Sequence, residues 1–170
     1  MRKPVALSVI LAVCLFFSVS MSAGAVATDE RATPAEIVQK VNEAVTLIQQ
    51  KGEAAFDTFR DKNGYFVWKD SYLFVIDVEG KMLVHPFTPT LEGMKFIGAQ
   101  DPNGKLFIAE QIAIVNSPSG QGWMEYWWVK PGEKTASPKV SFVKKVPGTK
   151  FYVGAGLFNL SKEAAEKGSK

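Results

Sequence analysis

The chain has 170 residues, with 20 Lys and Arg, 17 Asp and Glu, a single His and a formal net charge of +3. This near balance argues against a broad basic surface for nucleic acid or for an anionic membrane. With only one Cys and one His, the sequence also excludes a disulfide framework and a zinc site built from several such ligands.

The first 27 residues have the features of a secretory signal peptide. Arg2 and Lys3 precede an apolar run over residues 5–17, and two A-x-A cleavage motifs end at Ala25 and Ala27. We expect cleavage near Ala27, leaving one exported, periplasmic domain over residues 28–170 without a membrane span. Two alternatives remain open: a lipoprotein box ending at Cys14 and an uncleaved anchor.

The next third of the chain is predicted to be helical. Thr33 can cap a helix with Pro34 at its first position, and Glu36 completes a capping box. Apolar residues then recur at helical spacing up to Gly52, which ends the helix. A second, short helix is predicted over residues 53–60, before a turn at 61–64.

The rest of the chain is mainly β-structure with short turns. Short connections imply antiparallel pairing, so the sequence predicts an α+β domain with a five-stranded antiparallel sheet and a long N-terminal helix across one face. Strands are predicted over 71–76, 81–85, 123–129, 139–146 and 150–158, a helix over 106–115, and a polar helical tail after 159.

Two segments, beginning at Asp77 and Asp101, share the pattern D-x-x-G-K before an apolar run. Asp and Gly at these positions are typical of tight turns. We interpret the pattern as shared turn chemistry, with a true internal repeat as the alternative.

Enzyme motifs are missing from the sequence. It has no G-x-S-x-G elbow and no glycine-rich phosphate loop, because Gly154 and Gly156 fall inside a strand pattern. An active site made of two paired carboxylates stays open as an alternative. We expect a protein that is not an enzyme and uses no cofactor or metal.

Aromatic and basic side chains cluster around the predicted sheet. On a strand over 123–129, Met124, Tyr126 and Trp128 share one face, opposite to Trp123 and Trp127. One set can form core while the other lines a small-ligand pocket.

Two adjacent lysines, Lys144 and Lys145, must point to opposite faces of their strand. They are either solvated edge lysines or, with an imidazole and a tyrosine hydroxyl, part of an anion site.

Four segments carry a family resemblance: FVIDVEGKMLVHPFTPTLEGMKF, DPNGKLFI, GQGWMEYWWVKP and PKVSFVKKVPGTKFYVGAG. In order and spacing they resemble the single Cache domain of bacterial chemoreceptors and sensor kinases, over nearly the whole chain after residue 27. The resemblance implies a PAS-like fold and extracytoplasmic binding of small ligands, often acetate, propionate, lactate or pyruvate. The polar tail stands where receptors continue into a membrane helix, so we expect a stand-alone module that passes its state to a partner receptor or sensor protein.

The resemblance also implies site residues. His85 matches the H-P position of the family, and Phe142 stands where a Tyr is more usual, which puts the ligand in doubt. The expected ligand-binding residues are His85, Tyr126, Trp128, Lys139 and Trp68, to which we add Lys144 from the adjacent lysine pair. The alternative function is a non-catalytic interaction or accessory protein that uses the same fold as a scaffold.

Overall fold

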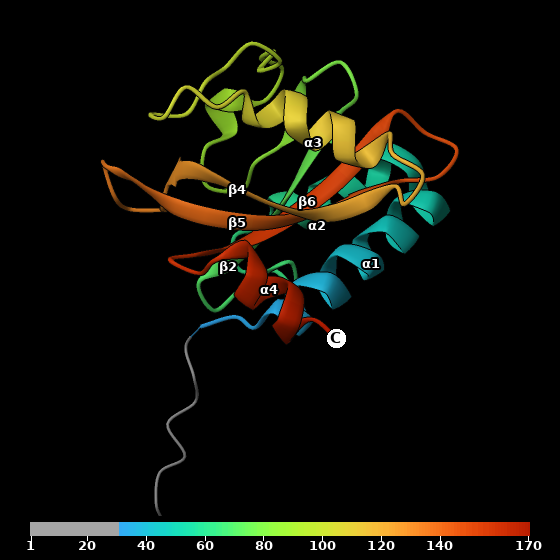
Figure 1. Cartoon of the computed structure of the whole chain (residues 1–170). Helices are drawn as coiled ribbons and strands as arrows, with labels where there is room; N and C mark the ends of the chain where they lie inside the picture. Colours follow the sequence, from blue (N-terminus) through green and yellow to red (C-terminus); the bar gives the residue numbers. More distant parts are fainter. Residues whose placement is uncertain (1–30) are drawn as a thin grey trace, which may run out of the picture.

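The structure is a computed structural model that describes residues 31–170. The predicted signal peptide and its two alternatives therefore lie outside the described residues. Figure 1 shows a central sheet with the helices α1, α2 and α4 on one face, and α3 with its flanking loops on the other. This α+β architecture confirms the predicted fold class.

All strand pairs of the sheet are antiparallel, in the order β1-β2-β6-β5-β4, with β3 also pairing with β2. The short strands β1 and β3 pair with opposite ends of β2, so the sheet of six strands is five strands wide. The prediction missed β1, because two residues are too few for alternation to be visible. The strands are β1 (Val67–Trp68), β2 (Ser71–Asp77), β3 (Met82–Val84), β4 (Gln121–Val129), β5 (Ala136–Lys145) and β6 (Phe151–Phe158).

Helix α1 (Pro34–Lys51) begins and ends where its capping residues predict. The Thr33 side chain accepts a hydrogen bond from the backbone N–H of Glu36, and the Glu36 carboxylate accepts one from the N–H of Thr33, at 2.8 Å. This reciprocal pair satisfies two N–H groups that the first turn leaves free. At the other end Gly52 has a positive φ of 60°, and a short 3-10 turn (Gly52–Ala55) leads into α2 (Phe56–Arg60).

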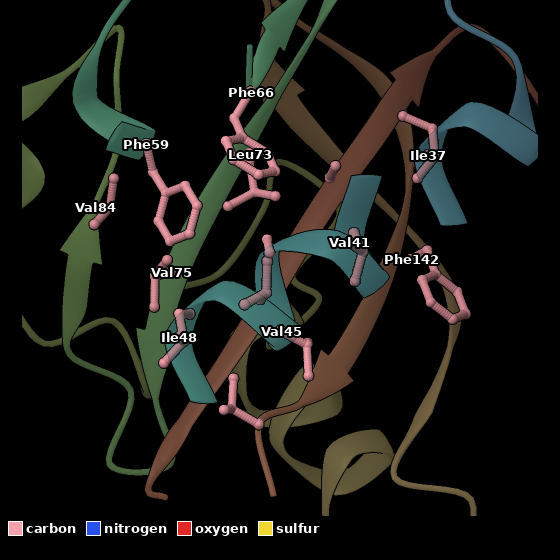
Figure 2. Packing of buried hydrophobic residues seen from close by; sticks show 14 of the residues in the cluster. Ile37, Val41, Val45, Ile48, Phe59, Phe66, Leu73, Val75, Val84 and Phe142 are labelled. Carbon is pink, nitrogen blue, oxygen red and sulfur yellow. The ribbon is translucent and has the colours of Figure 1, made fainter. Parts of the chain in front are cut away.

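The apolar stripe of α1 forms the larger core with one face of the sheet. Figure 2 shows Ile37, Val41, Val45 and Ile48 of α1 pointing toward residues of the sheet such as Leu73. Burying each such side chain contributes about 1.5–3 kcal/mol. Apolar side chains of α1 and of the sheet thus fill the space between them.

The opposite face of the sheet forms a second, smaller core under α3 (Phe107–Val115). Its side chains come from alternate positions on the same strands, such as Tyr72 and Phe74 on β2. Two further short helices, η2 (Pro89–Leu91) and α4 (Lys162–Gly168), lie in the segment after β3 and after β6. This second core includes the hydroxyl groups of Tyr72, Tyr126 and Tyr152.

Asp77 and Asp101 form the same turn. One carboxylate oxygen of Asp77 accepts the backbone N–H groups of Glu79 and Lys81, and Asp101 accepts the N–H groups two and four residues later in the same way. The two segments thus share turn chemistry, as predicted. Asp101 alone accepts a third N–H, from Trp127 on the edge strand β4, at 3.0 Å.

Candidate functional site

A small cavity lies between the sheet and α3, on the face away from α1. Measured as the space open to the centre of a water molecule, its volume is about 10 Å³, so it has room for about one water. Its lining combines aromatic rings with a few polar groups. The lining residues are Tyr72, Phe74, Ile76, Met82, His85, Phe107, Ile108, Gln111, Tyr126, Trp128 and Lys139.

Lys139 on β5 is the lining residue that carries an ammonium group, and it is 2% exposed. Its Nζ atom donates a hydrogen bond to the Tyr72 hydroxyl at 3.1 Å. In the part of the chain that the structure describes, Lys139 forms no ion pair. Burial lowers the pKa of Lys139 to about 7, because the charged form loses its hydration without gaining a counter-charge.

His85 follows β3 and is also buried. Its Nδ1 atom accepts the backbone N–H of Thr88 at 3.0 Å, so the neutral ring carries its proton on Nε2. Burial, and then the nearby charge of Lys139, lower the pKa of His85 to about 4. The Nε2 atom is buried without a hydrogen-bond partner among residues 31–170. The cavity therefore contains a neutral imidazole N–H that no acceptor satisfies.

Aromatic rings form the remaining wall of the cavity. Tyr126 stacks on Phe107 of α3 with ring centres 5.1 Å apart, and its hydroxyl is 3.2 Å from the Ser141 hydroxyl. Trp128 packs against Phe107 at 5.6 Å and against His85 at 6.1 Å. Burial raises the pKa of Tyr126 well above its usual value, so this hydroxyl stays protonated and can donate.

Two glycines of β6 give the cavity side chains their room. A Cβ atom at Gly154 would lie 2.3 Å from the Phe74 ring. At Gly156 it would lie 2.2 Å from the Ser141 hydroxyl oxygen and 3.0 Å from Cε of Lys139. The G-A-G sequence of β6 is therefore a packing requirement of this face, which allows Phe74 and Lys139 to lie across the strand.

The structure brings together four of the six expected site residues: His85, Tyr126, Trp128 and Lys139. Trp68 does not join them, because it lies next to Val67 on β1 and points to the opposite face, against the core under α1.

Lys144 is also separated from the cavity. Its Nζ atom donates to the Asn42 side chain of α1 at 2.7 Å, whereas Lys145 on the other face donates to Asn116. Lys144 lies five positions after Lys139, and an odd spacing on a strand places two side chains on opposite faces. Trp68 and Lys144 therefore do not line the expected cavity.

Phe142, where the family more often has Tyr, also points away from the cavity. It packs against Trp123 on the α1 side, with ring centres 5.4 Å apart. The hydroxyl that this substitution removes would not face the cavity. The neighbouring residue on the cavity side of β5 is Ser141, whose hydroxyl lies 3.2 Å from that of Tyr126.

Sequence reasoning missed Tyr72, Phe107 and Gln111 as lining residues. Tyr72 belongs to an unbroken apolar run in β2, where both faces are buried and alternation gives no signal. Gln111 is a polar residue within an otherwise apolar helix, and this was a sequence signal that the helix faces a polar site. In the structure Gln111 is 1% exposed and accepts a hydrogen bond from the Tyr152 hydroxyl.

Two larger grooves adjoin the cavity. One, of about 390 Å³, lies between the segment after His85 and the β4–β5 turn, and shares His85 and Trp128 with the cavity. The other, of about 590 Å³, lies at the β4 edge and shares Tyr126 and Lys139. Trp128 and His85 thus lie between the first groove and the cavity, and Tyr126 and Lys139 lie between the second groove and the cavity.

The described residues offer no site for a metal. Within residues 31–170 no group of three or more His, Cys, Asp or Glu side chains is close enough to hold an ion. No helix in the same range is both long and apolar enough to span a bilayer. The arrangement instead offers hydrogen-bond donors inside an aromatic wall, which suits a small acceptor-rich molecule.

Two curated proteins are similar to part of the chain. The sensor histidine kinase MctS of Rhizobium johnstonii is 36% identical over 90 residues, which is 53% of this chain and 19% of that protein. The methyl-accepting chemotaxis protein McpP of Pseudomonas putida is 27% identical over 89 residues, which is 52% of this chain and 16% of that protein. The matches therefore span less than a fifth of these relatives.

Two solved structures are similar over most of this chain. One, described as "Periplasmic sensor domain of chemotaxis protein", is 31% identical with a TM-score of 0.64, and the match covers 75% of this chain and 95% of that one. The other, described as "Structural basis for carboxylic acid recognition by a Cache chemosensory domain", is 25% identical with a TM-score of 0.65, covering 74% and 92%. The sequence profile of the family described as "Single Cache domain 2" matches residues 21–165, so the chain belongs to the single Cache domain family, whose members are extracytoplasmic sensor domains.

Proposed function

We propose that this chain is a periplasmic small-molecule sensing module that binds a short carboxylate, such as acetate, propionate, lactate or pyruvate, in the cavity under α3. One observation carries the proposal: the cavity contains a fully buried lysine and an unsatisfied imidazole N–H, with no acidic residue among its lining residues. A carboxylate is an acceptor-only anion, so it supplies both the missing counter-charge and the missing acceptor.

We propose the following contacts with the ligand. One carboxylate oxygen accepts from Nζ of Lys139 and the other from Nε2 of His85, with the Tyr126 hydroxyl as a further donor. Trp128 and Phe107 pack against the short apolar part of the ligand. Because the cavity has room for about one water, a lining side chain must move to admit a carboxylate. Trp128 is suited to this because it also lines the groove of about 390 Å³. Similarity to a Cache domain described as recognising carboxylic acids supports the choice of ligand class.

We further propose that the module binds its ligand without catalysis. The similarity to sensor domains that bind small ligands supports this. Its response is proposed to pass to a partner receptor or sensor protein, by analogy with the similar chemotaxis and kinase proteins.

Export is part of the same proposal. We propose that residues 1–27 are removed as a signal peptide and that residues 28–170 form the periplasmic domain. The intact mass of the protein from its native host tests this, with a mature start near Val26 or Thr28 as the expected result. Retention of Met1, or a lipid on Cys14, would contradict cleavage at this place.

The test of the ligand class is a thermal-shift screen with short carboxylates, amines and amino acids, followed by calorimetric titration of whichever carboxylate gives a shift. A ligand that binds only the folded state raises the melting temperature by mass action. We expect Lys139→Met to weaken carboxylate binding roughly ten- to a hundred-fold, because a hydrogen bond to a charged group is worth about 1.5–3 kcal/mol. His85→Ala should weaken it by a similar factor.

Lys144→Met is the matched control. It removes an ammonium group from the same strand, but on the face that contacts α1, so carboxylate affinity should be unchanged. Equal losses in Lys139→Met and Lys144→Met would contradict the placement of the site. A flat response to every carboxylate would contradict the ligand class and favour the scaffold function.

A further inference from the structure

We infer, on the basis of the proposed function, that a carboxylate binds in this cavity together with a proton that Lys139 takes up from solvent. The module would then respond to carboxylate concentration and acidity jointly. The inference begins with the surroundings of Nζ, which are aromatic and uncharged on the cavity side.

The side chains of β2 and β6 that contact the ammonium group are neutral. On β2, Nζ lies 3.1 Å from the Tyr72 hydroxyl and 5.6 Å from the Phe74 ring centre. On β6 it lies 5.0 Å from the ring centre of Phe158. Burial raises the pKa of Tyr72 far above its usual value, so this hydroxyl carries no negative charge at neutral pH.

The other titratable groups of the cavity are neutral as well. Tyr126 on β4 has a pKa raised by burial, and so does Tyr152 on β6, whose hydroxyl donates to Gln111 of α3. His85 is the neutral Nε2–H tautomer near pH 7, since its pKa is about 4. None of these groups gives Lys139 a negative partner.

The charged residues that line the groove of about 590 Å³ together with Lys139 already have other partners. Asp101 accepts three backbone N–H groups, from Asn103, Lys105 and Trp127. The Glu125 carboxylate accepts the backbone N–H of Lys162, and the Lys105 side chain is paired with Glu110 at 3.0 Å. Neither carboxylate forms an ion pair with Lys139.

A buried ammonium without a counter-charge loses its proton more readily than one in water. The pKa of about 7 means that much of Lys139 is neutral under mildly alkaline conditions. A bound carboxylate restores the counter-charge and favours the protonated form. The balanced step is neutral Lys139 plus one proton plus the carboxylate anion, giving an ammonium–carboxylate pair, with the proton drawn from water or buffer.

The size of the effect follows from linkage. With a free-state pKa of about 7, Lys139 is about one-tenth protonated at pH 8, so binding should take up about 0.9 proton there and only about 0.1 at pH 6. For the same reason, the dissociation constant should rise about tenfold per pH unit above pH 8. A carboxylate site built on an ordinary, solvated lysine would show neither effect between pH 6 and pH 9.

The experiment is calorimetric titration of the wild-type protein with acetate and with propionate, at pH 6 in phosphate and in Bis-Tris and at pH 8 in phosphate and in Tris. These buffers differ in ionisation enthalpy, so the difference in observed heat gives the number of protons taken up. We expect uptake near one proton at pH 8 and near zero at pH 6. Lys139→Met, titrated at higher ligand concentration, should show no uptake at pH 8.

A second measurement avoids reliance on a variant. The ¹³Cε resonance of Lys139, assigned by its absence from Lys139→Met, is followed from pH 6 to pH 10 with and without acetate. We expect a midpoint near pH 7 in the free protein and a midpoint above pH 9 at saturating acetate. Proton uptake by His85 would differ, since it would be seen below pH 6.

The outcomes separate the two proposals. Binding of either acid with no proton uptake at pH 8, or a Lys139 midpoint near 10 in the free protein, overturns the inference and leaves the proposed function standing. Failure of both acids to bind, with a flat carboxylate screen, overturns both.

Discussion

The Nζ atom of Lys139 lies 3.1 Å from the hydroxyl of Tyr72 and 4.3 Å from the centre of its ring. The ammonium group thus has Tyr72 of β2 as an aromatic partner, and within residues 31–170 it forms no ion pair with a carboxylate. A cation over an aromatic face gains about 2 kcal/mol when both are desolvated, which offsets only part of the loss of hydration. This incomplete compensation is why burial lowers the pKa of Lys139.

Lys139 should make the protein more stable at alkaline pH. Its pKa is lowered from 10.5 to about 7 on folding, so the unfolded chain binds more protons between these values. Stability is therefore lowest below pH 7, rises up to about pH 10.5, and should gain about 2 kcal/mol between pH 7 and pH 9 from this residue. Urea denaturation at both pH values measures the gain.

The matched comparison for this effect is Lys139→Met, which should lack the gain, while Lys144→Met should keep it. If wild type and Lys139→Met show the same change between pH 7 and pH 9, the folded-state pKa of Lys139 is not lowered.

His85 should lower the stability of the folded protein at acidic pH. Its pKa is lowered from 6.5 to about 4, so the stability present above pH 6.5 is lost progressively as the pH falls toward 4. Between pH 7 and pH 5 the loss attributable to this residue should be about 2 kcal/mol. Because acidic residues also titrate there, the quantity to measure is the difference between wild type and His85→Gln. Identical pH profiles for the two proteins would contradict this prediction.

Gly156→Ala should destabilise the fold and disturb the cavity. The added Cβ atom would lie 2.5 Å from the carbonyl oxygen of Val140 and 2.2 Å from the Ser141 hydroxyl oxygen. Overpacking of this kind costs about 1–3 kcal/mol. Urea denaturation measures the cost, with Gly98→Ala as control because a Cβ atom added there would meet no atom within 4 Å beyond its chain neighbours. Equal stability of the two variants would show that β6 can shift away from β5.

Asp101→Ala should loosen the edge of the sheet. The carboxylate accepts the N–H of Trp127 on β4 in addition to two N–H groups of its own turn, so its loss leaves three donors without this partner. We expect a loss of about 1–3 kcal/mol and faster amide hydrogen exchange at Trp127. Asp61→Ala is the control, since Asp61 accepts a single N–H in an exposed turn. Unchanged exchange at Trp127 would contradict the anchoring role.

Local features of the fold could be predicted from the sequence because their causes are local. Thr33, Pro34 and Glu36 define the start of α1 through hydrogen bonds within four residues. The D-x-x-G-K turns depend on one carboxylate and the N–H groups that follow it. Alternation on β4 correctly placed Tyr126 and Trp128 on one face, since that relationship is contained in a single strand.

The sequence was less informative about which residues of different strands lie on the same face of the sheet. The sequence grouped Trp68 and Lys144 with His85, although the two residues face the core under α1 or α1 itself. Period-two alternation tells which residues of one strand share a face, but not which face of that strand meets the helix. For the same reason, the sequence could not show that Phe142 points away from the cavity, so that a Tyr hydroxyl at this position would not face it.

By itself, the sequence determined the order of elements, their caps and turns, and the family resemblance, because each of these depends on residues close together in the chain. Only the tertiary structure decided that Lys139 is buried beside Tyr72, a residue 67 positions away. That contact requires β2, β6 and β5 to lie side by side, with Gly156 between them leaving space for the lysine. The charge state of Lys139 follows from its desolvation there, and desolvation is a property of the packed sheet rather than of any segment of the chain.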